Sequence, residues 1–223
     1  MWIVKIGGSL STAETLPLWL DALNCYFRGQ VVIVPGGGPF AELVHDSQLF
    51  WKYDDPSAHY MALLAMAQYG IMLTGLQPGL VPATSVADIH AALHRSTVPV
   101  WLPLTMVSED PTIEQSWGVT SDSLAAWLAQ RLGATRLILV KSITVGKPIV
   151  SVDELALNGI VDEAFPDYFR STAVETIILS DEQYGLLPQM LLAEVPGVPG
   201  GTQVAMAAGT ESVRYRTTLP FPT

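Results

Sequence analysis

Residues 2–9 read Trp-Ile-Val-Lys-Ile-Gly-Gly-Ser, and residues 31–38 read Val-Val-Ile-Val-Pro-Gly-Gly-Gly. Each stretch begins as an apolar run of strand length and ends at glycines, which is typical of a buried strand that stops at a turn. Glycine lets the backbone approach a ligand closely, and the outward N–H groups of such a turn form a nest for anions. Two such nests on neighbouring strands predict a site for two phosphoryl groups, which is what a phosphotransferase needs.

Positive charge is scarce in this chain. Its 223 residues include 11 Lys or Arg against 21 Asp or Glu, for a formal net charge of −10. Such a chain binds nucleic acid and anionic membranes poorly, so neither is expected as a partner. Lys5 stands directly before the first glycine turn, and Lys141 ends an apolar run. Lysine rarely occupies such positions without a partner, so both are expected to be functional.

The composition suits one large α/β domain, since 49% of the residues are hydrophobic and 14% are charged. No apolar run is long enough to cross a bilayer, and the N-terminus shows no signal-peptide pattern. The single cysteine, Cys25, excludes an intrachain disulfide and is typical of a reducing compartment. These features together predict a cytoplasmic protein.

Apolar runs alternate with helical patterns along the chain. Strands are expected at residues 2–6, 30–34, 98–103, 136–140 and 176–179. Helices are expected at residues 13–27, 39–48, 58–70, 86–94, 121–132, 152–158 and 184–192, with one or two late strands in 202–223. This alternation predicts an α/β fold, a three-layer αβα sandwich with a mostly parallel central sheet. Ligands of such sheets collect at the carboxyl ends of the strands.

Three motifs in this order resemble the amino acid kinase superfamily. They are Lys5-Ile6-Gly7-Gly8-Ser9, Gly36-Gly37-Gly38 and Ser121-Asp122-Ser123-Leu124-Ala125-Ala126. Residues 116–124 and 159–166 are similar to the branch that phosphorylates aminomethylfuran phosphate in the biosynthesis of methanofuran-type cofactors. The resemblance extends over about residues 1–192.

The resemblance implies an ATP-dependent kinase that converts a small phosphate monoester, aminomethylfuran phosphate in that branch, to a diphosphate. Mg²⁺ would be bound largely through ATP oxygens, without a dedicated metal site. Lys5 would act on the transferring group, and Asp122 would contact the substrate or organise the lysine. The expected nucleotide-binding residues are Gly7, Gly8, Ser9, Lys141, Gly146 and Lys147.

The acceptor would lie against the second glycine turn and the helix that starts at residue 121. Its phosphate would be cradled by Gly36, Gly37 and Gly38 and would receive hydrogen bonds from Ser121 and Ser123. His59 would reach the phosphate or the amine of the acceptor. Trp117 and Phe165 are candidates for stacking on a furan ring.

One motif departs from the family pattern. After the fourth main strand the family usually has Thr-Asp-Val-Asp-Gly, whereas residues 141–146 here read Lys-Ser-Ile-Thr-Val-Gly. Ser180-Asp181 also stands where Asn-Gly is usual. Either the nucleotide is gripped differently, with Lys141 or Lys147 on its phosphates, or ATP binding is weakened. The alternatives are a kinase for an amino acid, nucleoside or isopentenyl phosphate, and a binding or regulatory protein that keeps the kinase fold.

The expected organisation is one domain over residues 1–223. Its acceptor-binding part would span about residues 1–135 and its nucleotide-binding part about 136–223. Members of the superfamily are usually dimers or larger, so the resemblance implies a homodimer or higher homo-oligomer. An apolar helix face near residues 58–70 is the candidate interface.

Overall fold

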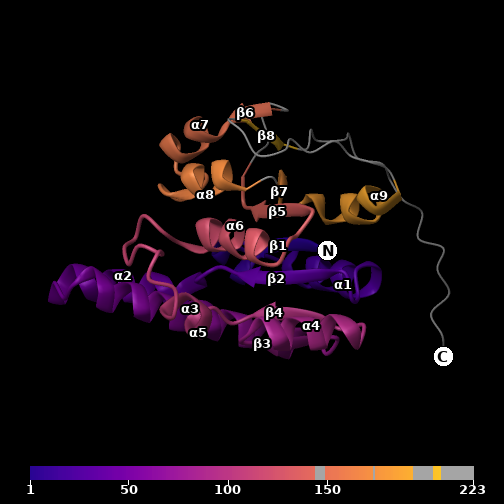
Figure 1. The fold of residues 1–223 in the computed structure, drawn as a ribbon, viewed down its shortest axis with the longest axis horizontal. Helices are drawn as coiled ribbons and strands as arrows, with labels where there is room; N and C mark the ends of the chain where they lie inside the picture. Colours follow the sequence, from indigo (N-terminus) through magenta and orange to yellow (C-terminus); the bar gives the residue numbers. More distant parts are fainter. Residues whose placement is uncertain (144–148, 173, 193–202, 207–223) are drawn as a thin grey trace.

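A sheet of eight strands organises the chain in the computed structural model, which describes residues 1–143, 149–172, 174–192 and 203–206 (Figure 1). Its order is β3-β4-β2-β1-β5-β7-β8-β6, and every neighbouring pair is parallel except β6 and β8. The strands are β1 (Trp2–Ile6), β2 (Val31–Pro35), β3 (Leu80–Ala83), β4 (Val98–Trp101), β5 (Arg136–Lys141), β6 (Ile149–Ser151), β7 (Glu175–Ser180) and β8 (Gln203–Met206). The expected mostly parallel sheet is confirmed.

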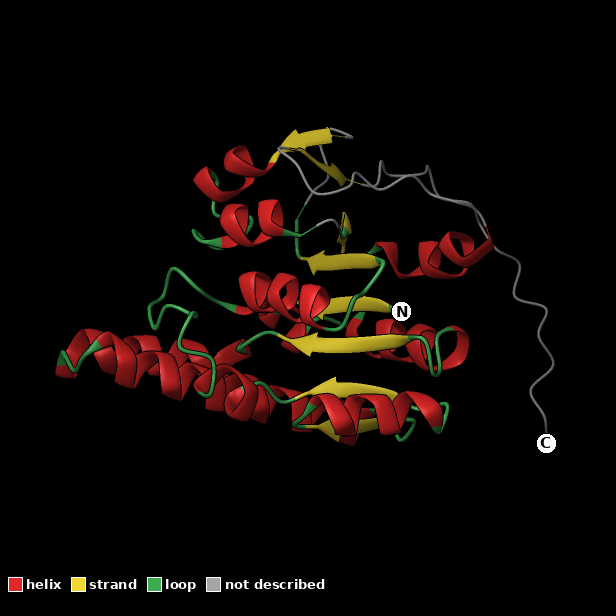
Figure 2. Cartoon of the chain, in the orientation of Figure 1, coloured by secondary structure: helices red, strands yellow, loops and turns green. Residues whose placement is uncertain are grey.

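Helices cover both faces of this sheet (Figure 2). They are α1 (Leu16–Tyr26), α2 (Gly38–Trp51), α3 (Asp55–Leu76), α4 (Val86–His94), α5 (Leu104–Ser108), α6 (Ser121–Arg131), α7 (Val152–Leu157), α8 (Phe165–Ser171) and α9 (Leu187–Leu192), with 3₁₀ turns η1 (Gly8–Thr12) and η2 (Gln183–Leu186). Side chains of alternate residues in the central strands pack into two hydrophobic cores, one on each face of the sheet. Ile3 belongs to the core with α6, and Val4 to the core with α1. Burial on both faces explains why these strands read as unbroken apolar runs.

Several short elements differ from the sequence expectation. Strand β3 was missed because Pro82 interrupts it, and the structure tolerates this proline because β3 is the edge strand of the sheet. The first helix begins at Leu16 rather than residue 13, since η1 occupies the preceding turn. The expected strand 98–103 ends at Trp101, and α5, α8 and β6 had not been expected. One late strand, β8, falls within the expected segment.

Two long helices, α2 and α3, run side by side and extend past the sheet on one side (Figure 1). Helix α3 is longer than expected, since it starts three residues earlier, at Asp55, and ends six residues later, at Leu76. At its start the Asp54 carboxylate accepts a hydrogen bond from the Ser57 N–H at 2.8 Å. No helix in the described part of the chain has both the length and the apolar character that a membrane crossing requires.

Candidate active site

The two glycine turns touch each other at the carboxyl edge of β1 and β2. A Cβ on Gly8 would lie 2.4 Å from the Gly38 nitrogen, and a Cβ on Gly36 would lie 2.4 Å from the Gly8 nitrogen. Only glycine fits at such a close backbone approach. The amide of Gly36 donates to the Ile6 carbonyl at 2.8 Å, and that of Gly7 to the Val140 carbonyl at 3.1 Å.

These two bonds change the expected roles of the glycines. Because Gly7 and Gly36 donate their N–H groups to neighbouring strands, these amides are not left for a phosphate. The turn residues that line the adjoining pocket are Gly8, Ser9, Gly37 and Gly38. Fewer backbone amides are therefore available to bind phosphate than the glycine motifs suggest.

A buried carboxylate joins the two lysines of interest. Asp122, in the first turn of α6, places Oδ1 2.8 Å from Nζ of Lys5 and Oδ2 2.5 Å from Nζ of Lys141. Lys5 comes from β1 and Lys141 from the end of β5, its neighbour in the sheet. The side chains of Lys5 and Asp122 are 5% and 4% exposed, and that of Lys141 is 14% exposed. This Lys5–Asp122–Lys141 group carries a net positive charge beside the glycine turns.

Burial and charge act in opposite directions on this group. Burial lowers the pKa of Lys5 to about 8, and the neighbouring Asp122 carboxylate opposes that shift. Burial would by itself raise the pKa of Asp122, but the ammonium groups of Lys141 and Lys5 outweigh it and bring this pKa to about 2. Asp122 is thus ionised at neutral pH and pairs with both lysines.

The start of α6 is held by a side chain from a distant part of the chain. Asp162, between α7 and α8, accepts hydrogen bonds from the N–H and hydroxyl of Thr120, at 3.0 and 2.8 Å. It also accepts from the N–H of Ser123 at 3.0 Å and from the Ser123 hydroxyl. These bonds satisfy amides that a helix start leaves without partners. Burial, followed by the nearby Asp122 charge, raises the pKa of Asp162.

This arrangement separates the two serines that were expected to bind the acceptor. Ser121 lines the cavity described below. Ser123 is fully buried, and both its N–H and its hydroxyl are bonded to Asp162, so the structure turns it away from the pocket. Sequence reasoning gave Asp162 no role, although residues 159–166 had drawn attention as a motif. A carboxylate that caps a helix 39 residues away leaves no local signal.

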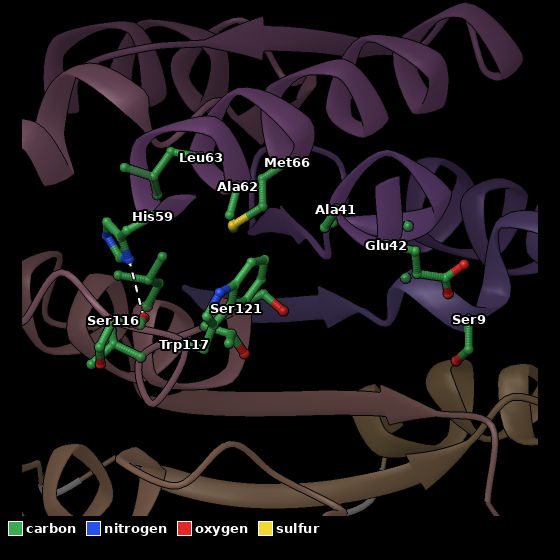
Figure 3. Close-up of a pocket in the computed structure, with 16 residues that line it drawn as sticks. Ser9, Ala41, Glu42, His59, Ala62, Leu63, Met66, Ser116, Trp117 and Ser121 are labelled. Carbon is green, nitrogen blue, oxygen red and sulfur yellow. Dashed lines mark hydrogen bonds between the residues drawn. The ribbon is translucent and has the colours of Figure 1, made fainter. Parts of the chain in front are cut away.

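A cavity of about 230 Å³ opens between the glycine turns, α2, α3 and the start of α6 (Figure 3). Figure 3 shows Ser9 and Glu42 at one end, His59 and Ser116 at the other, and Met66 between them. The lining residues are Gly8, Ser9, Gly37, Gly38, Ala41, Glu42, His59, Ala62, Leu63, Met66, Ser116, Trp117, Val119, Thr120, Ser121 and Leu124. The cavity therefore has polar ends and an apolar middle.

His59 stands at the end of the cavity remote from Ser9 and is 6% exposed. Its Nδ1 lies 3.3 Å from the Ser116 carbonyl oxygen, which can only accept, so Nδ1 carries the proton. Burial lowers the pKa of His59, which keeps the ring neutral at pH 7. Nε2 is then an acceptor, and it is buried without a partner among the described residues. Such a nitrogen suits an N–H or O–H donor better than a phosphate.

The structure places the two aromatic candidates, Trp117 and Phe165, in different surroundings. Trp117 lines the cavity, and its Nε1–H donates to Gln48 Oε1 at 2.6 Å. Phe165 is fully buried and stacks on Phe169, with ring centroids 5.9 Å apart, so its expected contact with a ligand ring is wrong. Glu42, which the sequence gave no reason to single out, lines the cavity from the first turns of α2.

The expected nucleotide residues are only partly visible. Gly146 and Lys147 lie outside the described residues. Lys141 points to Asp122, and the next residue, Ser142, lies with its Oγ 3.1 Å from Oγ of Ser9. Within the described ranges, no three His, Cys, Asp or Glu side chains gather where they could hold a metal ion.

Comparison with known proteins places the chain in a family. The profile of the amino acid kinase family matches residues 1–144. The chain is 29% identical over 193 residues to a (5-(aminomethyl)furan-3-yl)methyl phosphate kinase of Methanocaldococcus jannaschii, covering 81% of this chain and 88% of that protein.

Solved structures share the fold at low sequence identity. Uridylate kinase from Archaeoglobus fulgidus superposes with a TM-score of 0.63 at 16% identity, over 92% of this chain and 99% of its own. An isopentenyl phosphate kinase superposes with a TM-score of 0.56 at 16% identity, over 90% and 98%. The chain belongs to the amino acid kinase family, and this membership makes it a small-molecule kinase.

Proposed function

We propose that this kinase transfers the γ-phosphoryl group of ATP to a small phosphate monoester, and that the acceptor is an aminomethylfuran phosphate. The product would be the corresponding diphosphate, in the biosynthesis of a methanofuran-type cofactor. The similarity to the M. jannaschii enzyme over most of both chains supports this acceptor. The observation that carries the proposal is the cavity, with a glycine nest at one end and a neutral histidine at the other.

The shape of the cavity agrees with the chemistry of this acceptor. Its phosphate would lie at Gly8, Gly37 and Gly38, where backbone amides favour an anion. A flat apolar ring would pack on apolar residues that line the cavity, among them Leu63, Met66 and Leu124. The aminomethyl group would then reach the His59 end, where an ammonium N–H can donate to the unpaired Nε2.

Phosphoryl transfer needs positioning and charge neutralisation more than covalent help. An oxygen of the acceptor phosphate attacks the γ-phosphorus as the bond to the β–γ bridging oxygen breaks, and ADP leaves. The acceptor attacks as an anion, so no general base is required. Lys5 would stabilise the charge on the transferring group, while Asp122 holds both lysines in place. Gly8 and Ser9 would position the ATP phosphates, and Mg²⁺, when bound, would neutralise part of their charge.

A direct assay tests this proposal. The protein would be incubated with Mg·ATP and aminomethylfuran phosphate, and the products followed by ³¹P NMR and by ADP release. The expected result is a new diphosphate ester in a one-to-one ratio with ADP. Uridine monophosphate and isopentenyl phosphate serve as competing acceptors. Faster turnover of either would contradict the proposed acceptor, and binding of ATP with no acceptor turned over would favour a binding or regulatory protein on the kinase fold.

We further propose that residues 1–223 form one domain, with the acceptor part over about 1–135 and the nucleotide part over about 136–223. The Lys5–Asp122–Lys141 group supports this division, because Lys5 and Asp122 come from the first part and Lys141 from the second. We also propose a homodimer or higher homo-oligomer. Exposed apolar residues on α3 support it, namely Tyr60, Met61, Leu64 and Ile71.

A further inference from the structure

Three oxygen-bearing side chains, from Ser9, Ser142 and Asp181, converge at the carboxyl edge of the sheet, at the end of the cavity that Ser9 lines. Ser142 directly follows β5 and Asp181 directly follows β7, and these parallel strands align Lys141 with Ser180. The Ser142 hydroxyl donates to Oδ2 of Asp181 at 3.3 Å, and the Ser9 hydroxyl donates to Oγ of Ser142 at 3.1 Å. The first glycine turn, β5 and β7 thus each contribute one side chain to the same place.

The backbone of Asp181 is fixed on both sides. Its N–H donates to the Lys141 carbonyl at 3.0 Å, and its own carbonyl accepts from Nε1 of Trp19 at 2.7 Å. Asp181 is also half-buried. Its carboxylate is therefore presented from a rigid position, which is the condition for a preorganised binding group.

A carboxylate at this edge conflicts with a polyphosphate unless a cation lies between them. Mg²⁺ prefers oxygen ligands in octahedral geometry at about 2.0–2.1 Å, which puts adjacent ligand oxygens about 2.9 Å apart. The two separations in this group, 3.1 and 3.3 Å, are within a few tenths of an ångström of that value. A Ser hydroxyl together with an Asp carboxylate also holds the Mg²⁺ of ATP in other nucleotide-binding folds. The donor set fits Mg²⁺, and it leaves positions for ATP oxygens and water.

We propose that Asp181, with Ser142 and Ser9, forms the protein's share of a Mg·ATP site. This inference rests on the proposed function, because it requires that ATP is the phosphoryl donor. It also offers a reason for the altered motif after β5. The acidic group absent from residues 141–146 is supplied by the end of β7, whose last residue lies beside Lys141 in the sheet.

Calorimetry with ATP tests the proposal, in Mg²⁺ and separately in EDTA. Asp181→Asn keeps the shape and the backbone bonds but removes the charge. It should weaken binding of Mg·ATP by roughly tenfold or more. Binding of metal-free ATP should stay equal or become tighter, because a negative charge near the phosphates is gone. The neighbouring exposed residue gives a matched control, and Glu182→Gln should leave both affinities unchanged.

A second readout follows the metal itself. With Mn²⁺ in place of Mg²⁺, the paramagnetic resonance spectrum of enzyme-bound Mn·ATP should change in Asp181→Asn and in Ser142→Ala. Equal Mg²⁺ dependence of ATP affinity in wild type and both variants would overturn the inference, while turnover by wild type would leave the proposed function intact. A wild-type protein that binds ATP neither with nor without Mg²⁺ would overturn both. Circular dichroism checks that each variant is folded.

Discussion

The side chain of Lys5 is buried, and burial disfavours its charged form. Its side chain is 5% exposed, and the nearby Asp122 carboxylate is what keeps the ammonium form accessible at neutral pH. A buried lysine that is held by one carboxylate and stands directly before a glycine turn suits a group that must neutralise charge during transfer. Lys141 shares the same carboxylate, so Asp122 holds the two ammonium groups close together.

Replacing Lys5 tests this role most directly. Lys5→Met keeps the length of the side chain without its charge, and kcat should fall by about 10²-fold or more, the usual cost of removing one group that stabilises transition-state charge. Steady-state kinetics and circular dichroism would measure the effect and check the fold. Lys52→Gln removes an exposed lysine at the end of α2 and should leave kcat unchanged. Wild-type turnover in Lys5→Met would contradict the assignment.

The pKa of Lys5 also predicts an alkaline limit to activity. Since this pKa is about 8, the free enzyme loses the ammonium charge as the pH rises through 8, and kcat/KM should decline above that pH. A profile of kcat/KM from pH 6 to about pH 10 measures the decline. Lys5→Arg stays charged over this whole range, so its residual activity should lack the alkaline limb. An identical limb in both proteins would assign it to the acceptor amine instead.

At the scale of elements, the first turn of α6 is the centre of the site. In this turn Ser121 lines the cavity and Asp122 forms ion pairs with the two lysines. Asp162 accepts hydrogen bonds from Ser123 and from Thr120, the residue just before the helix. The segment after Asp162 adds a further link, because the Ala164 N–H donates to the Gly118 carbonyl at 3.0 Å. One short segment between α7 and α8 therefore fixes both the cavity wall and the position of the Asp122 carboxylate.

Asp162→Asn should disturb the cavity wall and the position of the Asp122 carboxylate together. An amide cannot accept from all four donors, so the start of α6 should shift at a cost of about 1–3 kcal/mol in the free energy of unfolding. We expect a lower kcat and a higher KM for the acceptor, with the KM for ATP nearly unchanged. Kinetics with each substrate varied in turn, beside thermal unfolding, would show this split. Glu163→Gln, an exposed neighbour, is the control; equal rises in both KM values would point to a general loss of structure.

The contact between the glycine turns predicts an effect on stability. A Cβ on Gly8 would meet the Gly38 backbone at 2.4 Å, so Gly8→Ala must push the turns apart. Overpacking of this kind typically costs about 1–3 kcal/mol, and phosphate binding should weaken as well. Thermal unfolding and ATP titration would measure the two losses. Gly75→Ala, where nothing lies within 4 Å, should be neutral or stabilising by up to about 1 kcal/mol; similar losses in both variants would refute this account of the turn.

At the scale of the whole molecule, α2 and α3 leave apolar side chains on the outside. Tyr60, Leu64 and Ile71 are 50%, 38% and 51% exposed, and their spacing places them along one side of α3. Exposed apolar residues grouped in this way are typical of protein interfaces. They support the proposed association of identical chains.

Light scattering after size-exclusion chromatography tests that association. The wild type should elute as a dimer or larger, since each chain is 24.1 kDa. Ile71→Lys puts a charge at the C-terminal end of the exposed row Tyr60, Leu64 and Ile71 on α3, and it should shift the protein toward a smaller species. Leu157→Lys changes an exposed leucine on α7 and should not. A wild type that scatters as a single chain at assay concentration would contradict the proposed oligomer.

The sequence by itself determined the parts that depend on local pattern. The apolar runs of β1, β2 and β5, their glycine ends and the position of Lys5 could all be read directly, because strand burial and turn formation are set by neighbouring residues. The short elements α5, α8 and β6 could not, since they are stabilised mainly by tertiary packing, and Pro82 concealed β3.

The tertiary structure alone decided which side chains meet. Asp122 lies 117 positions from Lys5 in the chain yet contacts it at 2.8 Å, and Asp162 caps a helix that begins 41 residues before it. Asp181, at the end of β7, contacts Ser142 at the end of the neighbouring strand β5. Such contacts depend on the order of strands in the sheet, which periodicity does not encode. The same packing turned Ser123 away from the cavity and buried Phe165 in the core. The residue types typical of a phosphoryl-transfer site could thus be identified in the sequence. Which side chains contact one another was decided only by the tertiary structure, because it brings the ends of distant strands together at one edge of the sheet.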